Sequence, residues 1–172
     1  MKKTIYAVVF LALLFSSCAN EFNKVYKSTD NNFKYEYAKE CFAKGKYVRA
    51  STLLQGLVTM QKGSDNAQES LYMLGMSEFN SRDYEGASAT FKKYCQSYPK
   101  GAYTEEARFL IGMSLYNCTP EPRLDQSQTV NAIAAFQEYI DLYPDGKQKK
   151  DAQQRLFELQ DKLVQKELYS AQ

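Results

Sequence analysis

The chain has 172 residues, 44% of them hydrophobic and 14% aromatic, which predicts a folded protein with room for one ordinary domain. Lys2 and Lys3 account for the formal net charge of +2, so the rest of the chain is neutral and gives no electrostatic indication of nucleic-acid binding. The sequence contains no histidine, which excludes His-dependent general-base catalysis and His-ligated metal sites. We therefore predict no enzymatic activity, no cofactor and no metal.

The amino terminus has the organisation of a secretory signal. Basic residues precede an unbroken apolar run over residues 5–15, which is too short to span a bilayer. Two serines stand directly before Cys18, and this arrangement resembles the lipobox of bacterial lipoproteins, in which the cysteine becomes the acylated first residue. Phe15 departs from the usual leucine of that motif. We predict a signal peptide over residues 1–17 and lipidation at Cys18, with an ordinary signal peptide and an incidental cysteine as the alternative.

Acylation would hold the protein on a membrane, because each buried methylene contributes about 0.8 kcal/mol and several chains together make binding essentially permanent. Ala19 follows the cysteine, which by resemblance to well-known lipoproteins favours the outer over the inner membrane. Residues 18–31 are mostly polar and lack apolar periodicity, so we expect a tether between the lipid and the first helix. The predicted location is the outer membrane, lipid-anchored and facing the periplasm.

Helices are predicted to follow in pairs. The first is expected over residues 32–44 and ends at Gly45, a residue that tolerates the left-handed conformation at a helix end. The second is expected over residues 47–59. Its apolar residues fall on one face at helical spacing: Ala50, Leu53, Leu54, Leu57 and Val58.

Capping signals mark the next pair. Asp65 and Gln68 have the spacing of a capping box, which predicts a helix from there to residue 80. Asp83 is the expected N-cap of the following helix, which Pro99 prevents from continuing. Lys92 and the lysine after it form a small basic cluster that we interpret as a solvated helix face.

The third pair is interrupted. Thr104 is the expected cap of a helix over residues 105–117. Two prolines within residues 118–126 forbid a helix there, and Ser127 or Thr129 is the expected cap of the next helix.

The carboxyl end is predicted to be a long helix from Lys149 onwards, with leucines and one alanine at steps of three to five residues. It has the pattern of a connecting helix that runs into the first helix of a fourth unit, yet no partner helix follows. Either this helix packs as a solvating cap, or the chain is a shortened version of a longer protein.

Three cysteines lie within the helical part: Cys41, Cys95 and Cys118. Their spacing has no C-x-x-C motif, so we expect free cysteines that pack as small hydrophobic side chains. A disulfide between Cys95 and Cys118 in an oxidising compartment is the alternative.

Two strings of the sequence recur. L-G-M-S-E-F-N at residues 74–80 returns as I-G-M-S-L-Y-N at residues 111–117, 37 residues later. A-x-x-x-F-x-x-Y-x-x-x-Y-P-x-G begins at Ala87 and again at Ala132, 45 residues later, so the later unit contains eight extra residues between its helices. The small and bulky positions resemble the tetratricopeptide (TPR) pattern. We predict an all-α solenoid with units at about 32–64, 65–103 and 104–148 and a partial fourth at 149–172.

Lipidation, a tether and TPR-like units with a proline-containing insertion together resemble the BamD family of the outer-membrane β-barrel assembly machinery. The specific resemblance lies in D-Q-S-x-T at 125–129, A-x-x-x-F at 132–136, Y-P-D-G at 143–146, R-L-x-x-L-x-x-K-L at 155–163 and E-x-Y at 167–169. It covers residues 18–172.

This resemblance implies a periplasmic scaffold that works alongside a BamA-like barrel-assembly protein and receives unfolded outer-membrane proteins. The family has further units towards its carboxyl end, and its contact with BamA draws on them. We expect substrate engagement to survive in this chain and BamA contact to be weakened or lost. A TPR lipoprotein that organises peptidoglycan enzymes is the competing interpretation; the insertion and the helix after it favour barrel assembly.

In a TPR superhelix the first helix of each pair lines the concave face. Residues at positions 5, 9 and 13 of each unit are therefore predicted to line a peptide-binding groove: Tyr35, Lys39, Tyr72, Met76, Asn80, Phe109, Met113 and Asn117. Aromatic and methionine side chains form an adaptable apolar surface, and asparagine amides can hydrogen-bond an extended backbone. The alternative is that several of these aromatics pack between helices, which we expect for position 12, occupied by Phe42, Phe79 and Tyr116.

Overall fold

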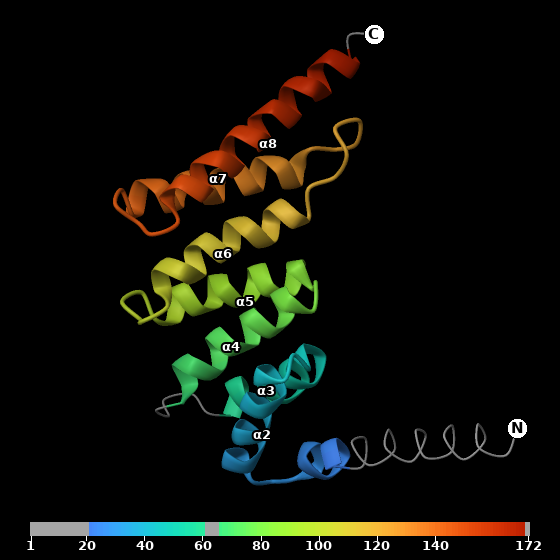
Figure 1. Ribbon diagram of the computed structural model, residues 1–172, viewed down its shortest axis with the longest axis vertical. Coiled ribbons are helices and arrows are strands. Elements are labelled where there is room, and N and C mark those ends of the chain that lie inside the picture. The colour runs from blue at the N-terminus through green and yellow to red at the C-terminus, as the bar shows by residue number, and fades with distance from the viewer. Residues whose placement is uncertain (1–20, 61–65, 171–172) are drawn as a thin grey trace, which may run out of the picture.

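A computed structural model describes residues 21–60 and 66–170 of the chain, and in these ranges the only regular structure is helical. A short helix at 21–27 precedes the main helices, and its Val25 is 0% exposed in the cluster around α2 and α3, so the prediction of a tether over residues 18–31 is wrong for this part. These are α2 (Asn31–Ala43), α3 (Tyr47–Met60), α4 (Ala67–Asn80), α5 (Tyr84–Ser97), α6 (Thr104–Asn117), α7 (Ser127–Leu142) and α8 (Lys149–Ser170). They stack in chain order along one axis as helical hairpins (Figure 1), which confirms the predicted TPR-like solenoid.

The interior is a continuous seam rather than one central core, because each helix packs mainly against its neighbours in the chain. One cluster of buried side chains is centred on the pair α2 and α3. A second cluster runs from α4 to α8. None of the helices in the described ranges has both the length and the hydropathy to cross a bilayer.

Glycine in the first helix of a pair sets how closely the second helix approaches. A Cβ atom added to Gly112 would lie 2.7 Å from ring carbons of Phe136 on α7, and one added to Gly75 would lie 2.7 Å from Phe91 on α5. Both phenylalanine rings are 0% exposed. The recurring glycine and phenylalanine of the sequence are therefore one packing device used twice.

The recurring tyrosine fixes the turn between pairs. The Tyr94 hydroxyl accepts hydrogen bonds from the Gln68 side chain at 2.6 Å and from the Tyr103 backbone N–H at 3.2 Å. In the next unit the Tyr139 hydroxyl accepts from the Gln148 backbone N–H at 3.1 Å. A buried ring thus satisfies a backbone donor at the start of the next helix, which joins successive units.

Some predicted helix ends are confirmed and others are wrong. The Asp83 carboxylate accepts from Gly86 N–H at 3.0 Å as an N-cap, and Gly45 has a φ of +70° after α2. Thr104 does not cap α6, because it lies inside the helix and its hydroxyl donates to the Tyr98 carbonyl at 2.6 Å. Asp65, one half of the predicted capping box, lies outside the described residues.

The helix that follows the insertion also lacks the side-chain cap that the sequence predicted. Gln126 occupies the N-cap position of α7 without a capping hydrogen bond, so the prediction of Ser127 or Thr129 as the cap is wrong. The buried Thr129 hydroxyl instead donates to Gln126 Oε1 at 2.7 Å. Gln126 Nε2 in turn donates to the carbonyls of Glu121 and Leu124, at 2.8 and 3.0 Å. This glutamine holds the irregular loop together from inside.

The long helix α8 packs against α7 and reaches α6. Lys162 Nζ donates to the Thr119 hydroxyl at 2.6 Å and Lys166 Nζ to the Arg123 carbonyl at 2.9 Å, which ties α8 to the insertion. Its outer face leaves large apolar side chains exposed: Phe157 at 72%, Val164 at 57% and Leu168 at 61%. The outer surface of α8 thus combines these apolar side chains with exposed polar ones, among them Gln153, Gln160 and Asp161.

Cys41, Cys95 and Cys118 are free, the first two of them buried, so the alternative of a disulfide between Cys95 and Cys118 is not realised in this structure. Burial raises the pKa of each of these thiols. The predicted signal peptide and the lipidation site Cys18 lie outside the described residues.

Candidate functional site

A pocket of about 240 Å³ opens between α2 and α4, the first helices of two successive pairs. Its wall combines apolar and charged side chains from both helices and from the turn before α6: Lys39, Phe42, Glu69, Tyr72, Met73, Met76 and Tyr103. A cleft of this kind, apolar with a few polar groups, is suited to holding a side chain of a bound ligand.

Two stacked aromatic rings form one side of this α2–α4 pocket. The ring centroids of Tyr72 and Tyr103 are 4.2 Å apart with an interplanar angle of 12°. Tyr72 also contacts Phe91 and Tyr94 of α5, at centroid distances of 6.0 and 5.9 Å. Burial, reinforced by the carboxylate of Glu106, raises the pKa of Tyr72, so its hydroxyl keeps its proton at neutral pH. The stack is therefore a rigid, neutral wall anchored in the core.

Charged groups lie at the edge of the same pocket. Tyr35 donates a hydrogen bond from its hydroxyl to Glu69 Oε2 at 2.7 Å, and burial together with this bond raises the pKa of Tyr35. The Lys39 ammonium lies 5.1 Å from the centroid of the Tyr35 ring. A carboxylate and an ammonium group thus flank an apolar hollow, one able to accept hydrogen bonds and the other to donate them.

Of the eight residues predicted for the groove, the structure brings three together in the pocket: Lys39, Tyr72 and Met76. Tyr35 is 3% exposed and packs in the core around α2 and α3, so its prediction as a groove surface is wrong. The Tyr35 side chain lies between α2 and α4, where its hydroxyl reaches Glu69, instead of facing solvent.

The three predicted groove residues of the third unit, and Asn80, are not part of this pocket. Phe109 is half-buried against Phe136 and Tyr139, at centroid distances of 6.0 and 5.6 Å. Met113 is half-buried and Asn80 is exposed. Asn117 is exposed as well, and its side-chain amide donates to the Met113 carbonyl of its own helix at 2.8 Å.

The aromatics of position 12 pack between helices as expected, although Phe42 also lines the α2–α4 pocket. Phe42 and Phe79 each make an edge contact with a tyrosine of the next helix, at 5.6 and 5.5 Å between centroids. Tyr116 donates to Glu158 Oε2 of α8 at 2.7 Å, and the Arg155 guanidinium lies 5.0 Å from the Tyr116 ring centroid. The carboxyl-terminal end of α6 is thus covered by α8.

Sequence reasoning missed Glu69 and Tyr103. Tyr103 is the N-cap residue of α6 and belongs to the turn between units, which the groove prediction did not consider. The only available signal was its position after the recurring P-x-G, where the backbone turns back towards the preceding first helix. Glu69 lies one turn before Met73 on α4 and differs from the predicted positions by a fraction of a helical turn.

Comparison with known proteins bears on this geometry. A family model described as "Outer membrane lipoprotein" (YfiO) matches residues 27–172. The chain is also 21% identical over 165 residues to the protein named "Outer membrane protein assembly factor BamD" from Caulobacter vibrioides, an alignment that covers 94% of this chain and 54% of that protein. The chain therefore spans about half the length of this relative.

Proposed function

Because the chain belongs to the YfiO family of outer membrane lipoproteins, we propose that it is a lipid-anchored periplasmic scaffold for the assembly of outer-membrane β-barrel proteins. In this proposal the α2–α4 pocket binds segments of unfolded outer-membrane proteins. The observation that carries the proposal is the combination of the family match over residues 27–172 with a pocket whose chemistry suits such segments.

The expected ligand has a recognisable pattern. Strands of membrane barrels alternate apolar residues with polar ones, so an extended segment presents an apolar side chain at every second residue. Met76 and Phe42 are adaptable partners for such a side chain, and the Tyr72–Tyr103 stack supports it from one side. Glu69 and Lys39 are in position to accept from and donate to the backbone of the segment. These contacts recognise a pattern rather than one sequence.

The anchor is the second part of the proposal. Acylation of Cys18, three residues before the helix at 21–27, would hold the solenoid close to the membrane where its substrates insert. Replacing Cys18 with Ser is expected to move the protein from the membrane fraction to the soluble fraction. An unchanged membrane fraction would show that the anchor is something else.

The pocket is tested with Met76→Lys, which places a charge in the half-buried hollow, and with the matched control Val48→Lys. Val48 is an apolar residue of α3 that is 67% exposed and lies outside the pocket. The probe is a fluorescein-labelled peptide from one strand of a porin, followed by fluorescence anisotropy. We expect at least a tenfold loss of affinity for Met76→Lys and none for Val48→Lys; equal affinities would contradict the proposed pocket.

A BamA-like barrel-assembly protein is the proposed partner. Affinity purification of the lipidated chain from detergent-solubilised outer membrane, with mass spectrometry of the bound proteins, tests it. Recovery of the barrel-assembly protein supports the proposal. Recovery of peptidoglycan enzymes instead would favour the competing adaptor role.

A further inference from the structure

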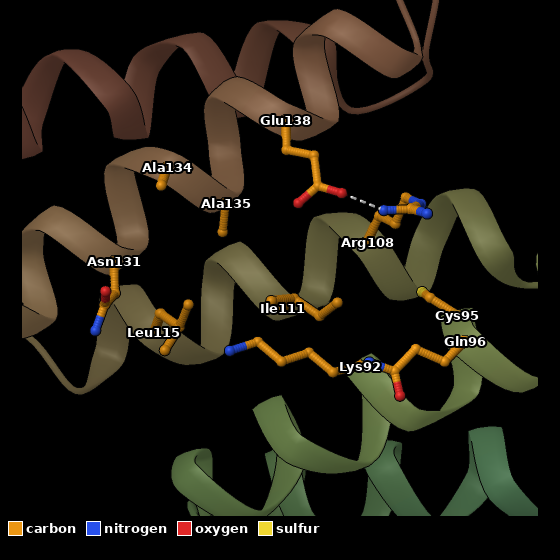
Figure 2. A pocket seen from close by; sticks show the side chains of 10 residues that line it. All are labelled: Lys92, Cys95, Gln96, Arg108, Ile111, Leu115, Asn131, Ala134, Ala135 and Glu138. Carbon is orange, nitrogen blue, oxygen red and sulfur yellow. Dashed lines mark hydrogen bonds and ion pairs between the residues drawn. The ribbon is translucent and has the colours of Figure 1, made fainter.

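A second, larger groove lies between α5, α6 and α7, with a volume of about 540 Å³ (Figure 2). Its lining is Lys92, Cys95, Gln96, Arg108, Ile111, Leu115, Asn131, Ala134, Ala135 and Glu138. Ile111 and Leu115 lie on the side of α6 opposite to Met113, because each residue turns a helix by about 100°. This α5–α7 groove is therefore on a different face from the predicted peptide groove.

The two ends of the α5–α7 groove differ in charge. At one end Arg108 Nη1 and Glu138 Oε1 form an ion pair at 2.5 Å, which closes that end with a neutral pair. At the other end the Lys92 side chain extends below Ile111 and Leu115 towards Asn131 (Figure 2). No ion-pair partner for Lys92 occurs among residues 21–60 and 66–170. An ammonium and a carboxamide thus flank an apolar floor, and Glu138 at the other end is the only acidic residue among the described residues that line the groove.

The preceding interface of the solenoid shows what fills the equivalent position. Stepping back by the repeat, Lys92 corresponds to Gln55, Leu115 to Glu78 and Ala135 to Thr90. There the Glu78 side chain is 5% exposed and its carboxylate lies beside the side chains of Gln55 and Thr90. At this interface the Glu78 carboxylate thus lies between α3 and α5, the second helices of two successive pairs.

At the next interface the same position lacks that carboxylate. Leucine replaces Glu78 and alanine replaces Thr90, and both changes remove polar atoms and, at Ala135, volume. Lysine replaces Gln55, and an ammonium group is a stronger partner for a carboxylate than an amide is. The groove is thus open, with a lysine at the position of Gln55 and no acid at the position of Glu78.

We propose that the α5–α7 groove is a docking site for a protein segment that inserts an acidic side chain beside Lys92 and Asn131 and an apolar side chain over Ile111 and Leu115. Its carboxylate supplies the acid that Glu78 supplies at the preceding interface, here next to the Leu115 side chain that replaces Glu78. The neutral Arg108–Glu138 pair limits the segment at the other end and leaves Lys92 as the charge that selects it. This site does not depend on the proposed function of the α2–α4 pocket.

The test uses phage-displayed random 12-residue peptides selected on the lipidated full chain in detergent. Enriched peptides are synthesised and their affinities measured by fluorescence anisotropy for wild type, for Lys92→Gln and for the matched control Lys93→Gln. Lys93 is the next residue on α5, is also exposed and does not line the groove. Each peptide is also made with its acidic residue replaced by the corresponding amide.

We expect enriched peptides with an Asp or Glu near an apolar residue, and at least a tenfold loss of affinity for Lys92→Gln with no loss for Lys93→Gln. The affinity of Lys92→Gln for the amide peptide is expected to be no lower than the affinity after either change alone, because both changes remove the same ion pair. Failure to select any peptide, or equal affinities for the two lysine variants, overturns the proposal. Peptides that lose affinity for Met76→Lys but not for Lys92→Gln overturn it too, while they support the α2–α4 pocket.

Discussion

Replacing Gly112 by Ala is expected to destabilise the solenoid, although alanine is the better helix former. An added Cβ would lie 2.7 Å from Cδ1 and Cε1 of Phe136. That ring is 0% exposed and has Phe109 as a neighbour at 6.0 Å, so it cannot turn outwards to make room. Either α6 and α7 must move apart or the ring must leave its rotamer.

The magnitude follows from two opposing terms. Alanine gains about 1 kcal/mol over glycine in a helix interior. Forcing an extra carbon into a filled core costs about 1–3 kcal/mol, and the enclosed ring puts this site in the upper part of that range. The free energy of unfolding should therefore fall by about 1–2 kcal/mol, which corresponds to a decrease in Tm of roughly 3–6 °C for a chain of this size.

The control is Gly56→Ala in α3, where an added Cβ has no atom within 4 Å. It receives only the helix-propensity term and should stabilise the protein by about 0.5–1 kcal/mol. Both variants are measured by urea and thermal unfolding with far-UV circular dichroism. If Gly112→Ala is as stable as Gly56→Ala, then the close approach of the helix pair is not what requires glycine at position 112.

Two further predictions concern single side chains. Burial raises the pKa of Glu78, so its contribution to stability is fully present below the ordinary glutamate pKa of 4.5 and is lost as the pH rises through the folded-state pKa. Glu78→Gln removes the titrating group, so above pH 4.5 the free energy of unfolding of the wild type should fall relative to that of the variant, by up to about 1.4 kcal/mol per pH unit. Urea unfolding of both proteins across this pH range measures the difference. Parallel curves would contradict the raised pKa. Arg82 has a φ of +67°. Because the left-handed conformation costs about 1–2 kcal/mol for a residue with a Cβ, Arg82→Gly should raise the free energy of unfolding by a net of about 0.5–1 kcal/mol, seen as a higher urea midpoint. An unchanged or lower midpoint would mean that the arginine side chain compensates for its backbone.

The sequence alone determined the elements and their order. The left-handed end at Gly45, the N-cap at Asp83 and the stop at Pro99 act within one turn of the chain, so they could be recognised without any tertiary contact. The recurring glycine, phenylalanine and tyrosine also identified the solenoid, because each pair of helices repeats the same contact. The motifs between Asp125 and Tyr169 carried the family resemblance, which the match over residues 27–172 confirms.

Only the tertiary structure decided which surfaces are exposed. A position within a repeat fixes the side of its helix, but the neighbouring helices determine whether that side meets solvent. Tyr35 is buried in the cluster around α2 and α3 and bonds to Glu69 of α4, whereas Tyr72 at the same repeat position lines the pocket. Tyr103 reaches that pocket by stacking on a ring from the preceding unit, a contact between residues 31 positions apart. The α5–α7 groove likewise arises from three helices that no local pattern places together.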